Sequence, residues 1–126
     1  MGRMTTQKSN EERIALLQGT LDLLILKTLV LGQRHGQGIA RAIQRQSEEA
    51  FFVDHGSLYL ALQRLEDKKL ISAKWGVSEN NRKARFYSLS AKGREHLAEK
   101  TSEWQRLTRA MALILGGAAA PDGEEG

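Results

Sequence analysis

Residues 55–90 read HGSLYLALQRLEDKKLISAKWGVSENNRKARFYSLS, and this stretch decides the fold. Leu58, Leu62 and Leu65 are spaced i, i+4 and i+7, which is the pattern of a helix with one apolar face. They predict a helix over 56–68 whose remaining faces are free to touch a partner.

The second half of the same stretch predicts an antiparallel β-hairpin. Apolar residues alternate with polar ones over 71–77, the period of a half-buried strand. Asn80 and Asn81 can turn the chain because asparagine tolerates left-handed backbone, and a second strand is predicted over 85–89.

Two further helices are predicted ahead of this stretch, over 20–31 and 38–47, separated by the glycine-rich turn GQRHGQG at 32–38. Asp22 is expected in the first turn of the first helix, a favourable place for a carboxylate. That helix is apolar almost all round, so we expect it to be buried on two sides, by the domain core and by a second subunit.

A long C-terminal helix is predicted over 91–115, capped by Ser90. Its apolar residues follow a heptad-like seam, which is typical of helices that pair between subunits. The residues predicted at a homodimer interface are Leu21, Leu24, Leu97, Trp104, Leu107, Met111 and Ile114.

Three helices followed by a hairpin predict a winged helix-turn-helix, a mostly α fold with a small antiparallel β-hairpin. The predicted organisation is a flexible N-terminus over 1–12, a DNA-binding domain over 13–90, a C-terminal dimerisation helix over 91–115 and a flexible tail over 116–126.

The third helix and the hairpin turn are the candidate DNA-binding elements. Small and hydrogen-bonding side chains at the start of the helix suit close approach to bases and phosphates, and the turn concentrates cations. The predicted DNA-binding residues are His55, Gly56, Ser57, Tyr59, Gln63, Arg64, Asn80, Asn81, Arg82, Lys83 and Arg85.

Several of these residues also have a plainer interpretation. A basic turn is commonly just a solvated loop, although its place after helix, strand and turn favours DNA contact. Tyr59 either touches a partner or packs against the second helix, and Trp75 is expected in the core of the hairpin. Trp104 is either a packing residue of the helical seam or a stacking platform for a flat aromatic ligand between subunits.

Composition restricts the remaining classes. The chain has 126 residues, a formal net charge of +4 and no cysteine, which excludes disulfides, thiolate metal sites and a cysteine nucleophile. The most apolar stretch, 16–31, is interrupted by Asp22 and Lys27 and is too short to span a membrane, so a soluble, cytoplasmic protein is expected.

Catalysis, metal binding and cofactor binding have no candidate residues. No Ser-His-Asp or paired-carboxylate arrangement is visible, and the three histidines lack metal-ligand spacing. Gly36 and Gly38 form a G-x-G, but no predicted strand precedes them and no third glycine follows, so nucleotide binding is not supported. We expect neither an enzyme nor a cofactor.

The motifs GTLDLLILKTL, HG-x-GI at 35–39, GSLY-x-AL-x-RLE at 56–66 and R-FY-x-LS-x-KG at 85–93 resemble the PadR family of bacterial transcriptional regulators. The resemblance covers about 16–115 and implies a homodimeric winged helix that binds operator DNA, usually as a repressor released by a small molecule. A single C-terminal helix resembles the shorter branch of the family. In multidrug-responsive members of that branch a tryptophan of this helix stacks on ligands, and Trp104 is the candidate here for binding a small aromatic effector.

The sequence departs from the family pattern at two places. Leu60 stands where the family commonly has proline, and the turn at the hairpin tip lacks the usual glycine. Leu60 lies on the predicted recognition helix and the glycine-free turn belongs to the predicted wing, so both departures fall within the candidate DNA-binding elements. The alternative to a regulator is a winged-helix protein-interaction module that does not bind DNA.

Overall fold

The computed structural model describes residues 14–15 and 18–116 of the chain. The elements, in chain order, are β1 (Ile14–Ala15), α2 (Gln18–Thr28), β2 (Arg34–His35), α3 (Gly36–Gln46), β3 (Phe51–Phe52), α4 (His55–Asp67), β4 (Ile71–Val77), β5 (Lys83–Leu89) and α5 (Ala91–Leu115). The flexible ends predicted over 1–12 and 116–126 lie outside the described residues, except for Gly116.

The core lies where α2, α3 and α4 meet. Leu58, Leu62 and Leu65 are almost completely buried, which confirms the apolar face predicted for α4. Ile25 of α2 and Ile39 of α3 are fully buried beside them. Burial of these side chains is the main force that holds the three helices together.

The sheet has three strands in the order β2-β5-β4, all antiparallel. The predicted hairpin is β4-β5. The short strand β2, which the sequence did not predict, pairs Arg34 with Tyr87 and His35 with Phe86. A separate parallel pair, β1 with β3, was also not predicted. The antiparallel sheet and the four helices among the described residues confirm the predicted winged-helix class.

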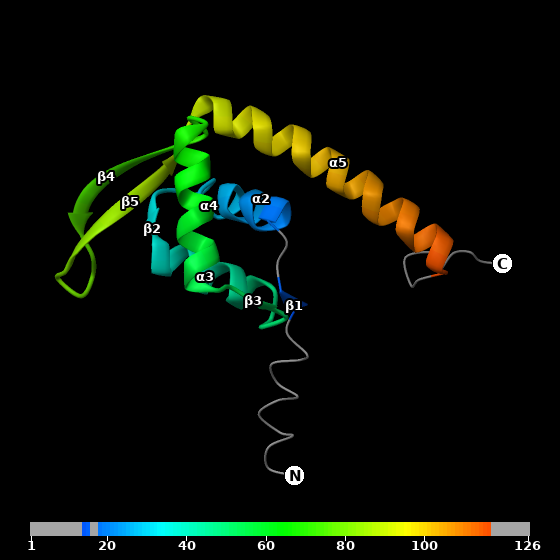
Figure 1. Ribbon diagram of the computed structural model, residues 1–126, viewed down its shortest axis with the longest axis horizontal. Coiled ribbons are helices and arrows are strands. Elements are labelled where there is room, and N and C mark those ends of the chain that lie inside the picture. Colours follow the sequence, from blue (N-terminus) through cyan, green and yellow to red (C-terminus); the bar gives the residue numbers. More distant parts are fainter. Residues whose placement is uncertain (1–13, 16–17, 117–126) are drawn as a thin grey trace, which may run out of the picture.

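The hairpin extends well beyond the core (Figure 1). Ile71 and Tyr87 at its base are buried, but Trp75 and Val77 further out are 61% and 66% exposed. The prediction that Trp75 lies in the hairpin core is therefore wrong. The alternation correctly indicates which side chains share a face of the hairpin, but the outer half of that face has no helix beneath it.

The helix boundaries differ from prediction at α2 and α3. Helix α2 begins at Gln18, so Asp22 is not in the first turn, and it ends at Thr28 rather than Leu31. Helix α3 begins at Gly36 because His35 acts as its N-cap: the backbone N–H of Gly38 donates to Nδ1 of His35 over 3.1 Å.

Helix α5 has the predicted bounds, and it leaves the domain on the side away from the hairpin (Figure 1). Ser90 caps it by accepting a hydrogen bond from the backbone N–H of Gly93 over 2.9 Å, and Gly116 ends it in left-handed backbone. Only Gly93 and Leu97 of this helix are buried, and both lie in its first two turns. Beyond Leu97 no residue of α5 is buried.

Two residues predicted at the dimer interface belong instead to the core of this chain. Leu21 is 3% exposed and Leu97 is 9% exposed, and both lie in the main hydrophobic cluster. Neither side chain has appreciable surface left for a second subunit.

Candidate nucleic-acid interface

The open face of α4 begins at a capped helix terminus. Asp54 is the N-cap, and the backbone N–H of Ser57 donates to its Oδ2 over 2.9 Å. This hydrogen bond is the main reason that the pKa of the Asp54 carboxyl lies below its ordinary value of 3.8. The cap thus fixes the first turn, where His55, Gly56 and Ser57 are all exposed.

Replacing Asp54 by alanine is expected to fray this turn, lower the urea midpoint of unfolding and weaken DNA binding, whereas asparagine retains a capping oxygen and most of both properties. Because the folded-state pKa is depressed, the carboxylate stabilises the fold at pH values above 3.8, and that contribution disappears as the pH falls through the folded pKa. Urea titrations across this range check the prediction. A difference between wild type and Asp54→Ala that stays undiminished well below pH 3.8 would contradict it.

The next turns of α4 continue the same exposed face with Tyr59, Leu60 and Gln63. Tyr59 is 50% exposed, and its hydroxyl lies close to Gly36, where a Cβ would come within 3.1 Å of it. Its ring therefore contacts the start of α3, as the packing interpretation predicts, and the exposed half of its surface leaves contact with a partner as a prediction. Leu60, at the position where the family has proline, is 62% exposed on this face.

Arg64, predicted to contact DNA, turns toward α2. Its Nη2 lies 2.7 Å from Oδ1 of Asp22, and both side chains are partly buried. Asp22 therefore pairs with Arg64 instead of stabilising the N-terminus of α2, where the sequence predicted it. The ion pair links α4 to α2. We therefore leave Arg64 out of the proposed interface.

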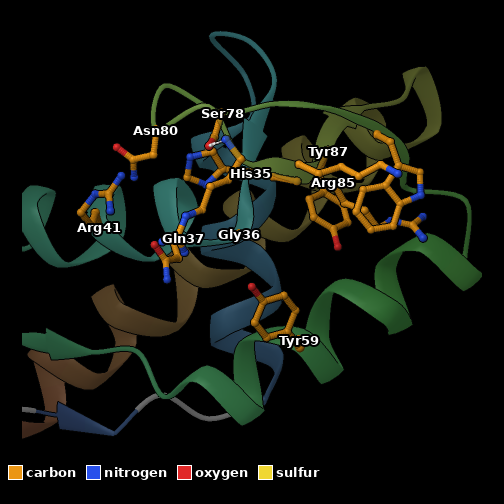
Figure 2. A pocket seen from close by; sticks show the side chains of 13 residues that line it. His35, Gly36, Gln37, Arg41, Tyr59, Ser78, Asn80, Arg85 and Tyr87 are labelled. Carbon is orange, nitrogen blue, oxygen red and sulfur yellow. Dashed lines mark hydrogen bonds between the residues drawn. The ribbon is translucent and has the colours of Figure 1, made fainter.

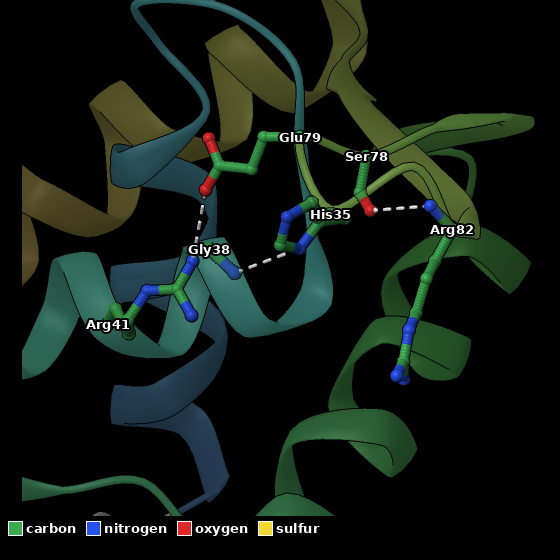
Figure 3. A network of polar contacts seen from close by, with 6 residues as sticks. All are labelled: His35, Gly38, Arg41, Ser78, Glu79 and Arg82. Atoms are coloured by element: carbon green, nitrogen blue, oxygen red, sulfur yellow. Dashed lines mark hydrogen bonds and ion pairs between the residues drawn. The ribbon is translucent and has the colours of Figure 1, made fainter.

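The turn of the hairpin closes without glycine. Asn81 adopts a φ of 61°, the left-handed conformation that asparagine tolerates better than most residues. The backbone N–H of Ser78 donates to the carbonyl of Arg82 over 2.8 Å, and the backbone N–H of Arg82 donates to Oγ of Ser78 over 3.4 Å (Figure 3). The predicted Asn80-Asn81 turn is thus confirmed, and it leaves the Arg82 side chain exposed.

An open cleft of about 440 Å³ separates the hairpin from α3 and α4 (Figure 2). It combines Tyr59 from α4 and the first residues of α3 with the wing, meaning the β4-β5 hairpin and its turn. Its cationic lining residues are Arg41, Arg82, Lys83 and Arg85. Of the residues predicted to bind DNA, the structure brings Tyr59, Asn80, Arg82, Lys83 and Arg85 to this concave surface. The lining does not include His55, Gly56, Ser57, Gln63 or Asn81.

The cations of this cleft differ in how far they are neutralised. Arg85 pairs with Glu66 over 2.8 Å, and Arg41 lies 3.9 Å from Glu79 (Figure 3). In the part of the chain that the structure describes, neither Arg82 nor Lys83 has an acidic partner within ion-pair distance. Positive charge is therefore most available at the tip of the wing.

Among the lining residues that sequence reasoning did not place at this surface are Arg41, His35 and Trp75. Arg41 and His35 enter it because β2 pairs with β5 and places the start of α3 against the wing. The strand register that places Trp75 opposite Arg85 is a signal that could have identified Trp75 as a residue of the cleft. How far the hydrophobic core extends along the hairpin was not visible in the sequence.

A second concave region lies between α2 and α5, away from the wing. Two hollows of about 500 and 510 Å³ adjoin there, and Trp104 and Leu23 line both of them. Trp104 is 37% exposed. Its position agrees with either a packing residue of a helical seam or a platform for a flat ligand.

Among the described residues there is no group of three or more His, Asp or Glu side chains that could hold a metal ion. In the same part of the chain, none of the helices has both the length and the apolar character needed to cross a membrane.

The helices α2, α3 and α4 with the basic hairpin beside them define a winged helix-turn-helix protein. The family model of the transcriptional regulator PadR-like family matches residues 25–99, which is more than half of the chain. The protein belongs to the PadR-like family of transcriptional regulators. This is a family of transcriptional regulators and not of enzymes.

Solved structures agree with this assignment. A PadR family transcription regulator from Clostridium difficile is 30% identical, with a TM-score of 0.66 over 75% of this chain and 97% of its own. A PadR-like regulator from Bacillus cereus is 27% identical, with a TM-score of 0.68 over 80% and 96%. PadR of Bacillus subtilis, solved in complex with operator DNA, shares the fold at 21% identity, with a TM-score of 0.58 over 64% of this chain and 46% of its own.

Proposed function

We propose that this protein is a dimeric DNA-binding repressor that acts in the cytoplasm. The exposed face of α4 enters the major groove and reads bases, while the wing holds the phosphate backbone. The observation that carries the proposal is the cleft in which Tyr59 of α4 and the free cations of the wing face one another. The complex of the Bacillus subtilis neighbour with operator DNA supports it by fold.

The roles divide by chemistry. Gln63 has the amide edge that suits adenine, and Ser57 and Tyr59 can donate to phosphate oxygens. His55, Gly56, Asn80 and Asn81 are proposed to line the same contact surface, and Arg85 to reach the backbone from its pair with Glu66. Leu60 presents an apolar side chain in place of a family proline, and contact with a thymine methyl would suit it.

Selection of bound fragments from fragmented genomic DNA tests this function. A regulator is expected to enrich a pseudo-palindromic site whose half-sites lie one helical turn apart. A winged-helix module that binds only proteins would enrich no sequence. Placing the selected site upstream of a reporter then tests repression, which requires that expression fall when the protein is present.

The dimer is proposed to form along the outer half of α5. Leu107, Met111 and Ile114 are 55%, 48% and 82% exposed on this helix, far more apolar surface than a helix in water normally presents. Leu24 of α2 and Trp104 extend the same seam toward the domain. This exposed apolar area favours an interface with a second copy of the chain.

Replacing Leu107 and Met111 together by lysine is expected to convert the dimer to a monomer, because two charges would be buried in the seam. Sedimentation equilibrium of wild type and variant measures this directly. The double replacement of Arg106 and Arg109 by alanine is a control at exposed positions on the same helix and off the seam, and it should leave the dimer intact. A wild-type chain that stays monomeric at all concentrations, or a variant that stays dimeric, would contradict the proposed interface.

A small aromatic effector is proposed to bind beside Trp104, between α2 and α5. The two hollows that meet at this indole supply the space, and their lining mixes apolar and charged side chains. Planar compounds that bind should change the fluorescence of Trp104 and weaken DNA binding. An emission unmoved by a panel of planar compounds would count against this site for those compounds.

A further inference from the structure

Trp75 is a large apolar side chain that contributes little to the core. Its indole is 61% exposed on the outer part of β4, and it lines the cleft between the wing and α4. Val77, two residues further along the same face, is also exposed. A side chain this exposed gains little from burial in the core, so core packing does not account for the ring.

Two cations flank the ring. The Nζ of Lys83 lies 5.6 Å from the ring centroid of Trp75, and the Cζ of Arg85 lies 5.8 Å from it. Trp75 and Arg85 are directly opposite each other in the hairpin, and Glu66 of α4 pairs with Arg85. The indole therefore lies within cation–π distance of two positive charges, and it lines the cleft.

The partner for such a surface must offer anionic groups and apolar surface at close spacing. A DNA backbone does so, because phosphates alternate with deoxyribose rings along each strand. An acidic protein surface would satisfy the cations but offers no such repeating apolar unit. Charge complementarity and the exposed ring together favour DNA.

We propose that Trp75 contacts DNA, with its indole packed on a deoxyribose of the strand whose phosphates bind Lys83 and Arg82. The inference rests on the proposed function and adds to it an apolar, salt-independent part of the affinity. The cations contribute by releasing counterions, which depends on salt, whereas burial of apolar surface does not.

The two tryptophans of the chain allow a direct test. In Trp104→Phe the only indole is Trp75, and in Trp75→Phe it is Trp104. Acrylamide quenching of each variant is measured with and without a random-sequence duplex at low salt. Trp75 is expected to become protected on DNA binding, while Trp104 stays as accessible as before. A ring that merely holds the hairpin together would not gain protection.

Affinity measurements separate the ring from the cations. Trp75→Ala is expected to weaken binding roughly tenfold at every salt concentration, with the slope of log K against log salt unchanged. Lys83→Gln should lower that slope by about 0.9 for each phosphate that is no longer neutralised. Since Trp75 is exposed, the thermal unfolding of Trp75→Ala should match that of the wild type.

Bound DNA that leaves Trp75 fully accessible, or a Trp75→Ala variant that binds as tightly as wild type, would overturn the inference alone. A Trp75→Ala variant whose salt slope falls would do the same, because the ring would then act only by positioning the cations. A wild-type protein that binds no duplex at all would overturn the proposed function, and the inference with it.

Discussion

Replacing Arg82 and Lys83 together by alanine is expected to weaken binding to every duplex by at least about tenfold at low salt. The two side chains are exposed at the tip of the wing and, among the described residues, have no acidic partner within ion-pair distance. Their charges are therefore free to replace condensed counterions on DNA. The slope of log K against log salt should fall by about 0.9 for each phosphate that the variant leaves without a cation.

Arg106→Ala with Arg109→Ala is the matched control. It removes the same two charges from exposed positions on α5, far from the cleft. Fluorescence anisotropy over a salt series compares the two double variants. If both lower the affinity equally, the effect belongs to net charge and the wing has no special role. An unchanged affinity and slope for the wing variant would refute the wing assignment outright.

Replacing Gly93 by alanine is expected to lower the free energy of unfolding by about 3 kcal/mol. A Cβ at this position would overlap the carbonyl oxygen of Leu70 and come within 2.8 Å of Cδ1 of Leu89. The first turn of α5 cannot move away easily, because Ser90 Oγ also donates to the Leu70 carbonyl over 2.9 Å. The substitution should therefore undock α5 from the base of the hairpin.

Gly19→Ala serves as the control for this prediction. A Cβ at Gly19, in α2, would meet nothing within 4 Å, so the helix should gain about 0.5 to 1 kcal/mol. Urea unfolding at one fixed protein concentration measures both variants, since dimerisation would otherwise shift the midpoints. A Gly93→Ala chain as stable as wild type would show that the close approach relaxes without cost.

Local patterns in the sequence predicted the elements that repeat over several turns. The leucine spacing of α4 and the long apolar seam of α5 determine helices by periodicity, and Ser90 marks the start of α5 by its capping chemistry. These elements carry the recognition surface and the proposed dimer seam, which explains why the class of protein could be inferred without a structure.

Features that depend on distant partners were missed. Strand β2 has two residues, too few for any period, and it exists because Arg34 and His35 pair with the far strand β5. A helical wheel places Arg64 off the apolar face of α4, but it cannot reveal that Asp22, 42 residues earlier, is its partner. Trp75 was wrongly assigned to the hairpin core because the alternation of apolar and polar residues predicts the face of the strand on which a side chain lies. It does not predict whether the rest of the domain covers that face.

The titration that bears most directly on the central claim compares two duplexes of equal length and composition, the selected site and a scrambled version of it. Affinity and stoichiometry are measured by anisotropy at physiological salt. The proposed function predicts that two chains bind the selected site at least about a thousandfold more tightly than the scrambled duplex. Equal affinities for the two duplexes, or no binding to either, would contradict the claim that α4 and the wing read DNA.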